Sequence, residues 1–72
     1  MKIYSLPVEI RSANEVCSTF YLSVAGYSSM DRAKKALEVK ATTIRLSLHE
    51  SFTLWFNLGL VFISDYKSLK DR

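Results

Sequence analysis

The sequence predicts an α+β fold, a single antiparallel sheet of four to five strands with one helix packed on one face. The first observation is the alternation of apolar and polar residues along residues 2–11, 16–27 and 42–64, which is the period of half-buried strands. The second is the helical period within residues 30–40, where apolar residues recur three or four positions apart. Together they give the order β-β-α-β-β-β along the chain.

The size and composition fit one small domain that spans residues 1–72. A hydrophobic content of 49% is too high for a disordered chain. Cys17 is the only cysteine, so no disulfide forms within the chain and we expect a reducing compartment, the cytoplasm. The longest apolar run, Leu58 to Ile63, is far shorter than the roughly 20 residues that cross a bilayer. The N-terminus also lacks an apolar signal core, so no membrane association is expected.

The first two strands are expected at residues 2–11 and 16–27, joined by the polar break at residues 12–15. Pro7 cannot donate a ladder hydrogen bond, which predicts that the first strand lies at an edge of the sheet. The residues expected to face inward are Tyr4, Leu6, Val8 and Ile10 in the first strand and Val16, Phe20, Leu22 and Val24 in the second.

The helix is expected over residues 30–40, because this segment is rich in good helix formers. Ser28 or Ser29 precedes it and supplies an N-cap oxygen for the free amides of the first turn. A narrow apolar stripe faces the sheet, and basic side chains face water. The stripe consists of Met30, Ala33 and Leu37, and the basic residues are Arg32, Lys34 and Lys35.

Residues 42–64 are interpreted as three short antiparallel strands separated by two turns, with a positive φ expected at Gly59 in the second turn. A competing interpretation makes residues 50–63 a helix. It is less favoured because this helix would be apolar nearly all round and would need complete burial. Residues 65–72 are polar and expected to fray. The alternation assigns Leu54, Phe56, Leu60 and Phe62 to the core and Trp55, Val61 and Ile63 to the opposite face.

Catalytic residue types are scarce in this sequence. Cys17 and His49 are the only candidates for a nucleophile and its base, and we favour an ordinary packed or exposed position for each. Too few histidines and cysteines are present for a metal site. The two glycines, at positions 26 and 59, are too far apart for a phosphate-binding loop. We therefore expect a protein without enzymatic activity and without a cofactor.

The aromatic residues point instead to a binding surface. A single helix covers one face of a sheet, and a second face that carries Tyr21, Trp55, Val61 and Ile63 is too apolar to stay exposed. Tryptophan and tyrosine are frequent anchors of protein interfaces. Two interpretations follow: this face binds a different protein or a second copy of the chain, or the strand register differs or loops and the end of the chain cover these residues.

The basic helix is the other candidate surface. The net charge is +3, and Arg32, Lys34 and Lys35 could follow a phosphate backbone. A solvated helix face is favoured over direct nucleic-acid binding, because the glycine-aromatic run of sheet-based RNA binders is absent. The predicted partner-binding residues are Trp55, Tyr21, Val61, Ile63, Arg32, Lys34 and Lys35.

From Ser28 to Ser64, about half of the chain, a serine-capped basic helix precedes a stranded segment with a central tryptophan. These residues, SSMDRAKKAL and then TIRLSLHESFTLWFNLGLVFIS, resemble certain small phage-encoded anti-CRISPR proteins. The resemblance implies a non-enzymatic protein that binds the surface of a CRISPR effector complex, often at positively charged sites for nucleic acid. The basic net charge departs from the acidic, DNA-mimicking type, so binding would depend on shape, apolar anchors and Lys/Arg pairs.

A second resemblance, to ribbon-helix-helix repressors, covers too little of their fold to support an assignment. The segment TTIRLSLHES and the apolar run after it look like the opening of ribbon-helix-helix repressors, but the polar end of the chain is too short for their second helix.

The predicted function is a small binding protein that inhibits or modulates a larger protein or nucleoprotein complex by occupying a surface. The alternatives are a nucleic-acid-binding protein that uses the basic helix and a homodimeric regulatory module.

Overall fold

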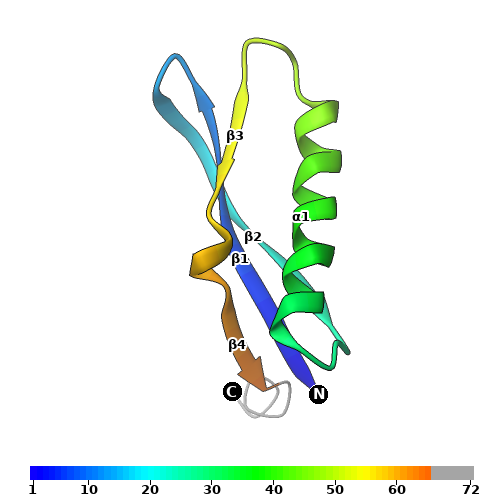
Figure 1. Ribbon diagram of the computed structural model, residues 1–72. Coiled ribbons are helices and arrows are strands. Elements are labelled where there is room, and N and C mark those ends of the chain that lie inside the picture. Colours follow the sequence, from blue (N-terminus) through cyan, green and yellow to red (C-terminus); the bar gives the residue numbers. More distant parts are fainter. Residues whose placement is uncertain (66–72) are drawn as a thin grey trace.

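The computed structural model describes residues 1–65 and confirms the α+β class, with one helix on one face of a four-stranded antiparallel sheet (Figure 1). The strands are β1 (Lys2–Ser12), β2 (Glu15–Ala25), β3 (Thr53–Phe56) and β4 (Phe62–Asp65). The helix α1 covers Met30–Ser47, and a short 3-10 helix covers Leu58–Leu60. The predicted fraying tail lies outside the described residues, except that Asp65 ends β4.

The sheet is organised around β1, which corrects the expectation that Pro7 places this strand at an edge. β2 pairs with one side of β1, while β3 and β4 both pair with the other side. The β3 pairing ends at Val8 and the β4 pairing begins at Ser5, so Leu6 and Pro7 lie opposite the interruption between the two short strands. A residue without an N–H is tolerated there because no strand partner is present on that side.

The two long strands form a hairpin with a two-residue loop. Ser12 pairs with Glu15, and the loop residues Ala13 and Asn14 have φ values of 51° and 71°. Two consecutive positive φ angles are typical of a type I′ turn, whose twist matches that of the flanking strands. Asparagine tolerates this conformation, whereas alanine adopts it at a cost.

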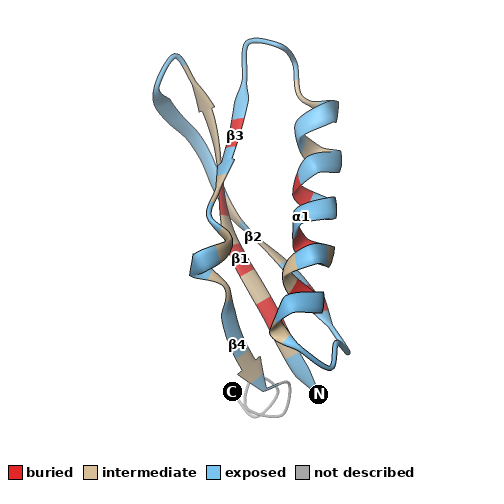
Figure 2. Cartoon of the chain, viewed as in Figure 1, coloured by how far each residue is buried: buried red, intermediate tan, exposed pale blue. Residues whose placement is uncertain are grey.

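The core lies between α1 and the face of the sheet that carries the even-numbered residues of β1. Figure 2 shows the buried positions on β1 and on the side of α1 that faces the sheet. The helix contributes small side chains, which let it approach the sheet closely, and one large one, Leu37. The buried residues are Tyr4, Leu6, Val8, Val24, Ala33, Leu37, Ala41 and Leu54.

The helix is longer than predicted and replaces the first of the three expected C-terminal strands. The alternation of Ile44, Leu46 and Leu48 predicts the first of these strands over residues 43–49, but α1 continues to Ser47, and Leu48 caps its end by donating its N–H to the carbonyl of Arg45. Alternation in this segment is also compatible with a helix, because Ile44 and Leu48 are four positions apart and both pack against the core. The N-cap is Ser29, whose hydroxyl oxygen accepts from the N–H of Arg32.

The last two strands are present, so the competing helix over residues 50–63 is wrong. Their register differs from the predicted one, because the 3-10 turn between them does not keep the two-residue period of a strand. Leu54 and Phe56 face the core as predicted, whereas Leu60 and Phe62 are exposed and Val61 packs against the core instead.

The prediction of a positive φ at Gly59 is wrong. Gly26, between β2 and α1, has a φ of +85°, and it is the glycine that the backbone conformation requires. Gly59 does not have a positive φ; it lies inside the 3-10 turn and donates its N–H to the side-chain oxygen of Asn57 over 2.9 Å. The turn is therefore set by the asparagine cap.

Candidate protein-binding surface

The sheet has a second face that α1 does not cover, and we call it the open sheet face. Cross-strand pairs place Pro7 beside Tyr21, Glu9 beside Trp55, and Ser5 beside Phe62. These odd-numbered residues of β1 alternate with the buried ones, so they and their partners point away from the helix. The open sheet face therefore consists of Ile3, Ser5, Pro7, Glu9, Arg11, Val16, Thr19, Tyr21, Ser23, Ala25, Thr53, Trp55, Phe62 and Ser64.

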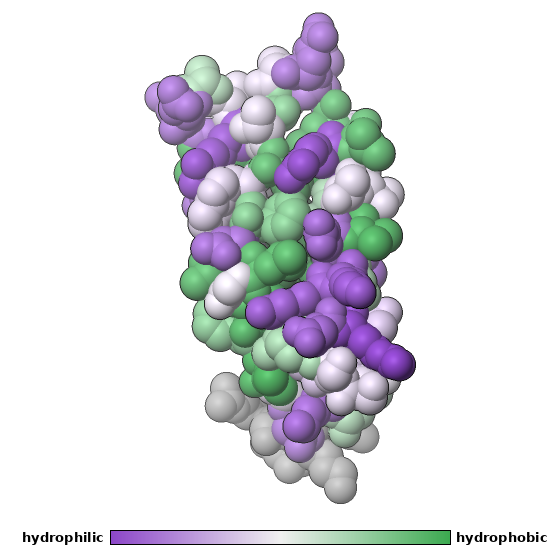
Figure 3. Space-filling model, viewed as in Figure 1, coloured by the Kyte–Doolittle hydropathy of each residue, from purple (hydrophilic) through white to green (hydrophobic). Residues whose placement is uncertain are grey.

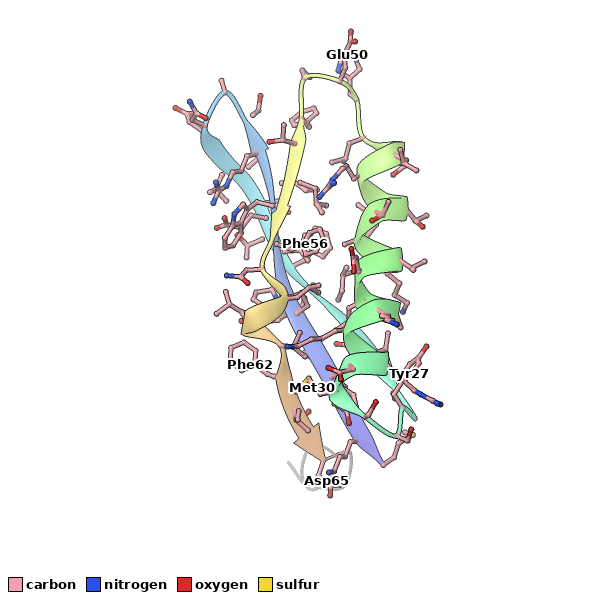
Figure 4. The ribbon with its side chains drawn as sticks, in the orientation of Figure 1. Tyr27, Met30, Glu50, Phe56, Phe62 and Asp65 are labelled. Atoms are coloured by element: carbon pink, nitrogen blue, oxygen red, sulfur yellow. The ribbon has the colours of Figure 1, made fainter. Side chains whose placement is uncertain are left out.

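The two faces can be compared directly in Figure 4. The ring of Phe56 on β3 lies between the sheet and α1, whereas the ring of Phe62 lies on the opposite side of β4. Three aromatic side chains of the open sheet face are substantially accessible: Tyr21 is 64% exposed, Phe62 56% and Trp55 40%. Each comes from a different strand, so the central strand β1 positions all three.

Small hydroxyl side chains flank these rings on the neighbouring positions of the strands. The hydroxyls of Ser5 and Ser23 form a hydrogen bond of 2.9 Å across the β1–β2 pair. Thr19 and Thr53 lie beside Glu9 and Arg11 in the neighbouring strands. Hydroxyl groups can donate and accept, so this surface offers adaptable hydrogen bonding between rigid aromatic anchors.

Arg11 is held between an acidic group and an aromatic ring. Its Nε donates to the Glu9 carboxylate over 3.1 Å, and its guanidinium carbon lies 4.9 Å from the centre of the Trp55 ring. The pair with Glu9 neutralises the charge of Arg11, and the ring contact orients the indole. The open sheet face therefore carries no net charge, which suits an apolar contact better than a phosphate contact.

The structure brings together only two of the four predicted sheet residues. Tyr21 and Trp55 lie on the open sheet face as expected. Val61 is half-buried against the core, and Ile63 pairs with Tyr4, so it belongs to the helix side of the sheet, where it is 50% exposed. Phe62 takes their place on the open sheet face. Sequence alternation placed Phe62 on the wrong face because the 3-10 turn between β3 and β4 shifts the register of β4.

The helix side of the molecule has its own mixture of polar and apolar surface. Figure 3 shows hydrophobic side chains at the surface between α1 and the part of the sheet formed by β3 and β4, with hydrophilic side chains over α1. Arg45, in the last turn of α1, lies 5.6 Å from the centre of the Phe56 ring at this boundary. This surface and the open sheet face are on opposite sides of the sheet.

The predicted basic residues do not form one cluster. Successive helix residues are about 100° apart, so Arg32 and Lys34 lie on nearly opposite flanks of α1. Lys35 points into solvent between them, and Lys34 is half-buried. The ammonium of Lys40 donates to the carbonyl of Ser23 over 3.1 Å. These side chains and the open sheet face are on different sides of the molecule, so the seven predicted residues cannot contact one flat partner together.

The two residues considered for nucleophilic chemistry have separate partners. The thiol of Cys17 is exposed and points to the carbonyl of Glu15 over 3.8 Å. His49 Nδ1 lies 2.8 Å from the Ser51 hydroxyl, within the connection from α1 to β3. Among residues 1–65, no hydrogen bond joins this thiol to this imidazole, which is the contact that a nucleophile and its base require.

The described part of the chain carries no metal-binding group and no pocket. Within residues 1–65 no three His, Cys, Asp or Glu side chains are grouped closely enough to hold a metal ion. Over the same residues, no helix has the length and apolar content to cross a membrane. The open sheet face is thus the most distinctive surface that these residues present.

Comparison with known proteins identifies no relative. No protein-family model, no curated protein and no solved structure matches the chain. The resemblance to anti-CRISPR proteins therefore stays a prediction, and the site rests on its own geometry.

Proposed function

We propose that this chain is a non-enzymatic binding protein whose open sheet face docks on another protein. The observation that carries the proposal is the set of three exposed aromatic residues, Tyr21, Trp55 and Phe62, on the face that α1 leaves uncovered. Exposed apolar surface of this kind is costly to keep in water, and on folded domains it usually marks an interface.

The chemistry of the face supports a protein partner. Tryptophan, tyrosine and arginine are the residue types most enriched among the residues that dominate binding energy at protein interfaces. Arg11 contacts the ring of Trp55, and Tyr21 lies on the same face of the sheet, on the other side of β1. Rigid aromatic anchors among small hydroxyl residues are also the composition of antibody binding loops, which recognise protein surfaces.

The same geometry does not favour nucleic acid as the ligand. A protein that follows a phosphate backbone needs several free cations along one surface. On the open sheet face Arg11 is paired with Glu9, and on α1 the basic side chains are spread around the helix. Nucleic-acid binding through α1 is therefore the weaker alternative.

Within this proposal the biological effect is inhibition or modulation. A domain of 72 residues that covers a functional surface of a larger complex blocks whatever normally binds there. The resemblance to small phage-encoded inhibitors suggests a CRISPR effector complex as that target. The support for the target is the resemblance alone, whereas the support for the binding face is its geometry.

Site-specific crosslinking tests the face directly. A photoreactive phenylalanine analogue would be placed at Phe62 or Tyr21, which keeps an aromatic ring there, and at Lys35 on α1 as the matched control. We expect covalent adducts with a discrete protein from host lysate at the two sheet positions and none at the helix position. Trp55→Ala should reduce adduct formation about tenfold or more, since buried tryptophan anchors contribute at least ~2 kcal/mol to binding.

Two outcomes would contradict the proposal. Adducts that form at Lys35 and not at Phe62 would move the interface to α1. Retention on a nucleic-acid column that falls steeply with salt and is lost in the Lys34→Ala/Lys35→Ala variant would establish the alternative instead.

A further inference from the structure

The outer edge of β2 has no strand partner among residues 1–65, and one side-chain contact reaches it, from Lys40. β2 is 11 residues long and pairs only with β1, so one row of its backbone groups faces away from the sheet. Natural proteins protect such edges with proline, inward-pointing charges or short strands. β2 contains no proline or lysine, and its one charged residue, Glu15, is at its first position. A bulge at Cys17 interrupts the pairing of β2 with β1, because Ile10 pairs with Ser18 and Arg11 with Val16. The regular part of the edge is therefore residues 18–25, which carry no charge and are open to pairing.

One contact shows which backbone groups point outward. The carbonyl of Ser23 accepts a hydrogen bond from the Lys40 ammonium, which reaches it from α1, so this carbonyl faces the free edge. In an antiparallel strand the N–H and C=O of one residue point to the same side, and the side alternates along the chain. The N–H and C=O groups of Thr19 and Tyr21 therefore also face outward.

We infer that β2 pairs with β2 of a second copy of this chain, in an antiparallel arrangement around a twofold axis near Phe20. This pairing would join the two sheets into one continuous sheet. Both helices would lie on one face of that sheet, and the two open sheet faces would form its other face. Isologous contacts of this kind are the commonest way in which proteins form dimers.

The charged groups near the edge of β2 favour a second copy of this chain as its partner. An antiparallel pair places the two Glu15 residues at opposite ends, about 30 Å apart at roughly 3.3 Å per residue, so they do not repel each other. Each Glu15 instead lies beside the Ser23–Ala25 end of the other β2, where Lys40 is held. Within residues 1–65 the carboxylate of Glu15 has no ion-pair partner, and Lys40 bonds only to a carbonyl. The pairing would give each of these charges an opposite one.

The first test is solution mass, with one backbone substitution at the edge. Light scattering and sedimentation equilibrium should give the mass of a dimer for the wild type. Thr19→Pro removes an outward N–H without removing a hydrogen bond to β1, so it should weaken dimerisation about tenfold or more while leaving the circular dichroism spectrum unchanged. Thr19→Ala keeps the N–H and should dimerise like the wild type.

The second test is a distance measurement that uses the natural cysteine. Cys17 is exposed and is the only cysteine, so a spin label attaches at one position in each copy. Antiparallel pairing centred on Phe20 places Cys17 of one copy opposite Ser23 of the other, so the two labelled positions are six residues apart along the strand, about 20 Å at roughly 3.3 Å per residue. Glu15→Lys should weaken the dimer, and Glu15→Lys with Lys40→Glu should restore it.

The inference is overturned by a wild type that stays monomeric at high concentration. It is equally overturned by a dimer that survives Thr19→Pro or whose labels give a different distance. These results would leave the proposed function intact, because the crosslinks expected at Phe62 and Tyr21 do not depend on the β2 edge. Conversely, if no crosslinks formed at Phe62 and Tyr21, the solution mass of the dimer and the distance between the Cys17 labels would still test the pairing of β2.

Discussion

Leu37 and Leu46 provide a matched test of how α1 is oriented, because the same substitution at each should have very different effects. Both leucines lie in α1, but Leu37 is 0% exposed in the core and Leu46 is 81% exposed on the outer side. Leu37→Ala removes about three carbon groups at ~0.8 kcal/mol each and leaves a cavity, so the free energy of unfolding should fall by about 3 kcal/mol. Leu46→Ala should change it by less than about 0.5 kcal/mol.

The loss at Leu37 is large relative to the total stability of such a domain. At roughly 0.05–0.15 kcal/mol per residue, the free energy of unfolding is about 4–11 kcal/mol for this chain. Urea unfolding followed by circular dichroism measures both variants. With a slope of about 1 kcal/mol per molar urea, the Leu37→Ala midpoint should fall by about 3 M and the Leu46→Ala midpoint should hardly move.

Equal destabilisation by the two substitutions would refute this orientation of α1. It would mean that the outer side of the helix is also buried. If Leu46→Ala were instead the more damaging of the two, the expected strand over residues 43–49 would be restored as an explanation, since Leu46 would then face a core.

Three further predictions concern the turn, the helix cap and the arginine–tryptophan contact. Ala13→Asn combined with Asn14→Gly should raise the melting temperature by about 4–8 °C, because Asn-Gly adopts the type I′ turn with less strain and such changes contribute about 1 kcal/mol. Ser29→Ala removes the N-cap oxygen and should lower the free energy of unfolding by about 1 kcal/mol, measured by thermal denaturation. Arg11→Met should cost about 0.5–1 kcal/mol and should change the emission of Trp55, the only tryptophan in the chain.

The cap and the arginine–tryptophan contact each have a control within the chain. Ser28→Ala changes a serine that precedes the cap and should leave the melting temperature unchanged, so an equal loss there would contradict the assignment of the cap. Arg32→Met changes an exposed arginine of α1 and should not affect tryptophan emission. A destabilised Asn-Gly variant would show that Ala13 and Asn14 do not form the type I′ turn.

Local patterns were sufficient to predict the hairpin and the start of the helix. The alternation along β1 and β2 placed Tyr4, Leu6 and Val8 in the core, and the helical period placed Ala33 and Leu37 there. These elements are set by residues that are neighbours in sequence. The same alternation found Tyr21 and Trp55 for the candidate site, because each lies within an uninterrupted strand.

The remaining features depend on contacts that no local pattern contains. The central place of β1, despite Pro7, arises because two short strands from the end of the chain pair with it at separate points. The length of α1 was ambiguous because the apolar spacing of residues 44–48 fits a strand and a helix equally. Phe62 was assigned to the wrong face because the side chain of Asn57 caps a turn that shifts the register of β4.

The pairing of Lys2 with Asp65 has a consequence for how the protein is made. Because synthesis proceeds from the N-terminus, the β1–β2 hairpin and α1 emerge first, while one side of β1 still lacks both of its partner strands. During that interval the side of β1 that later pairs with β3 and β4 is exposed to other chains. The proline in the middle of that edge interrupts its row of hydrogen-bond donors, so it also protects the nascent chain against aggregation until β3 and β4 arrive.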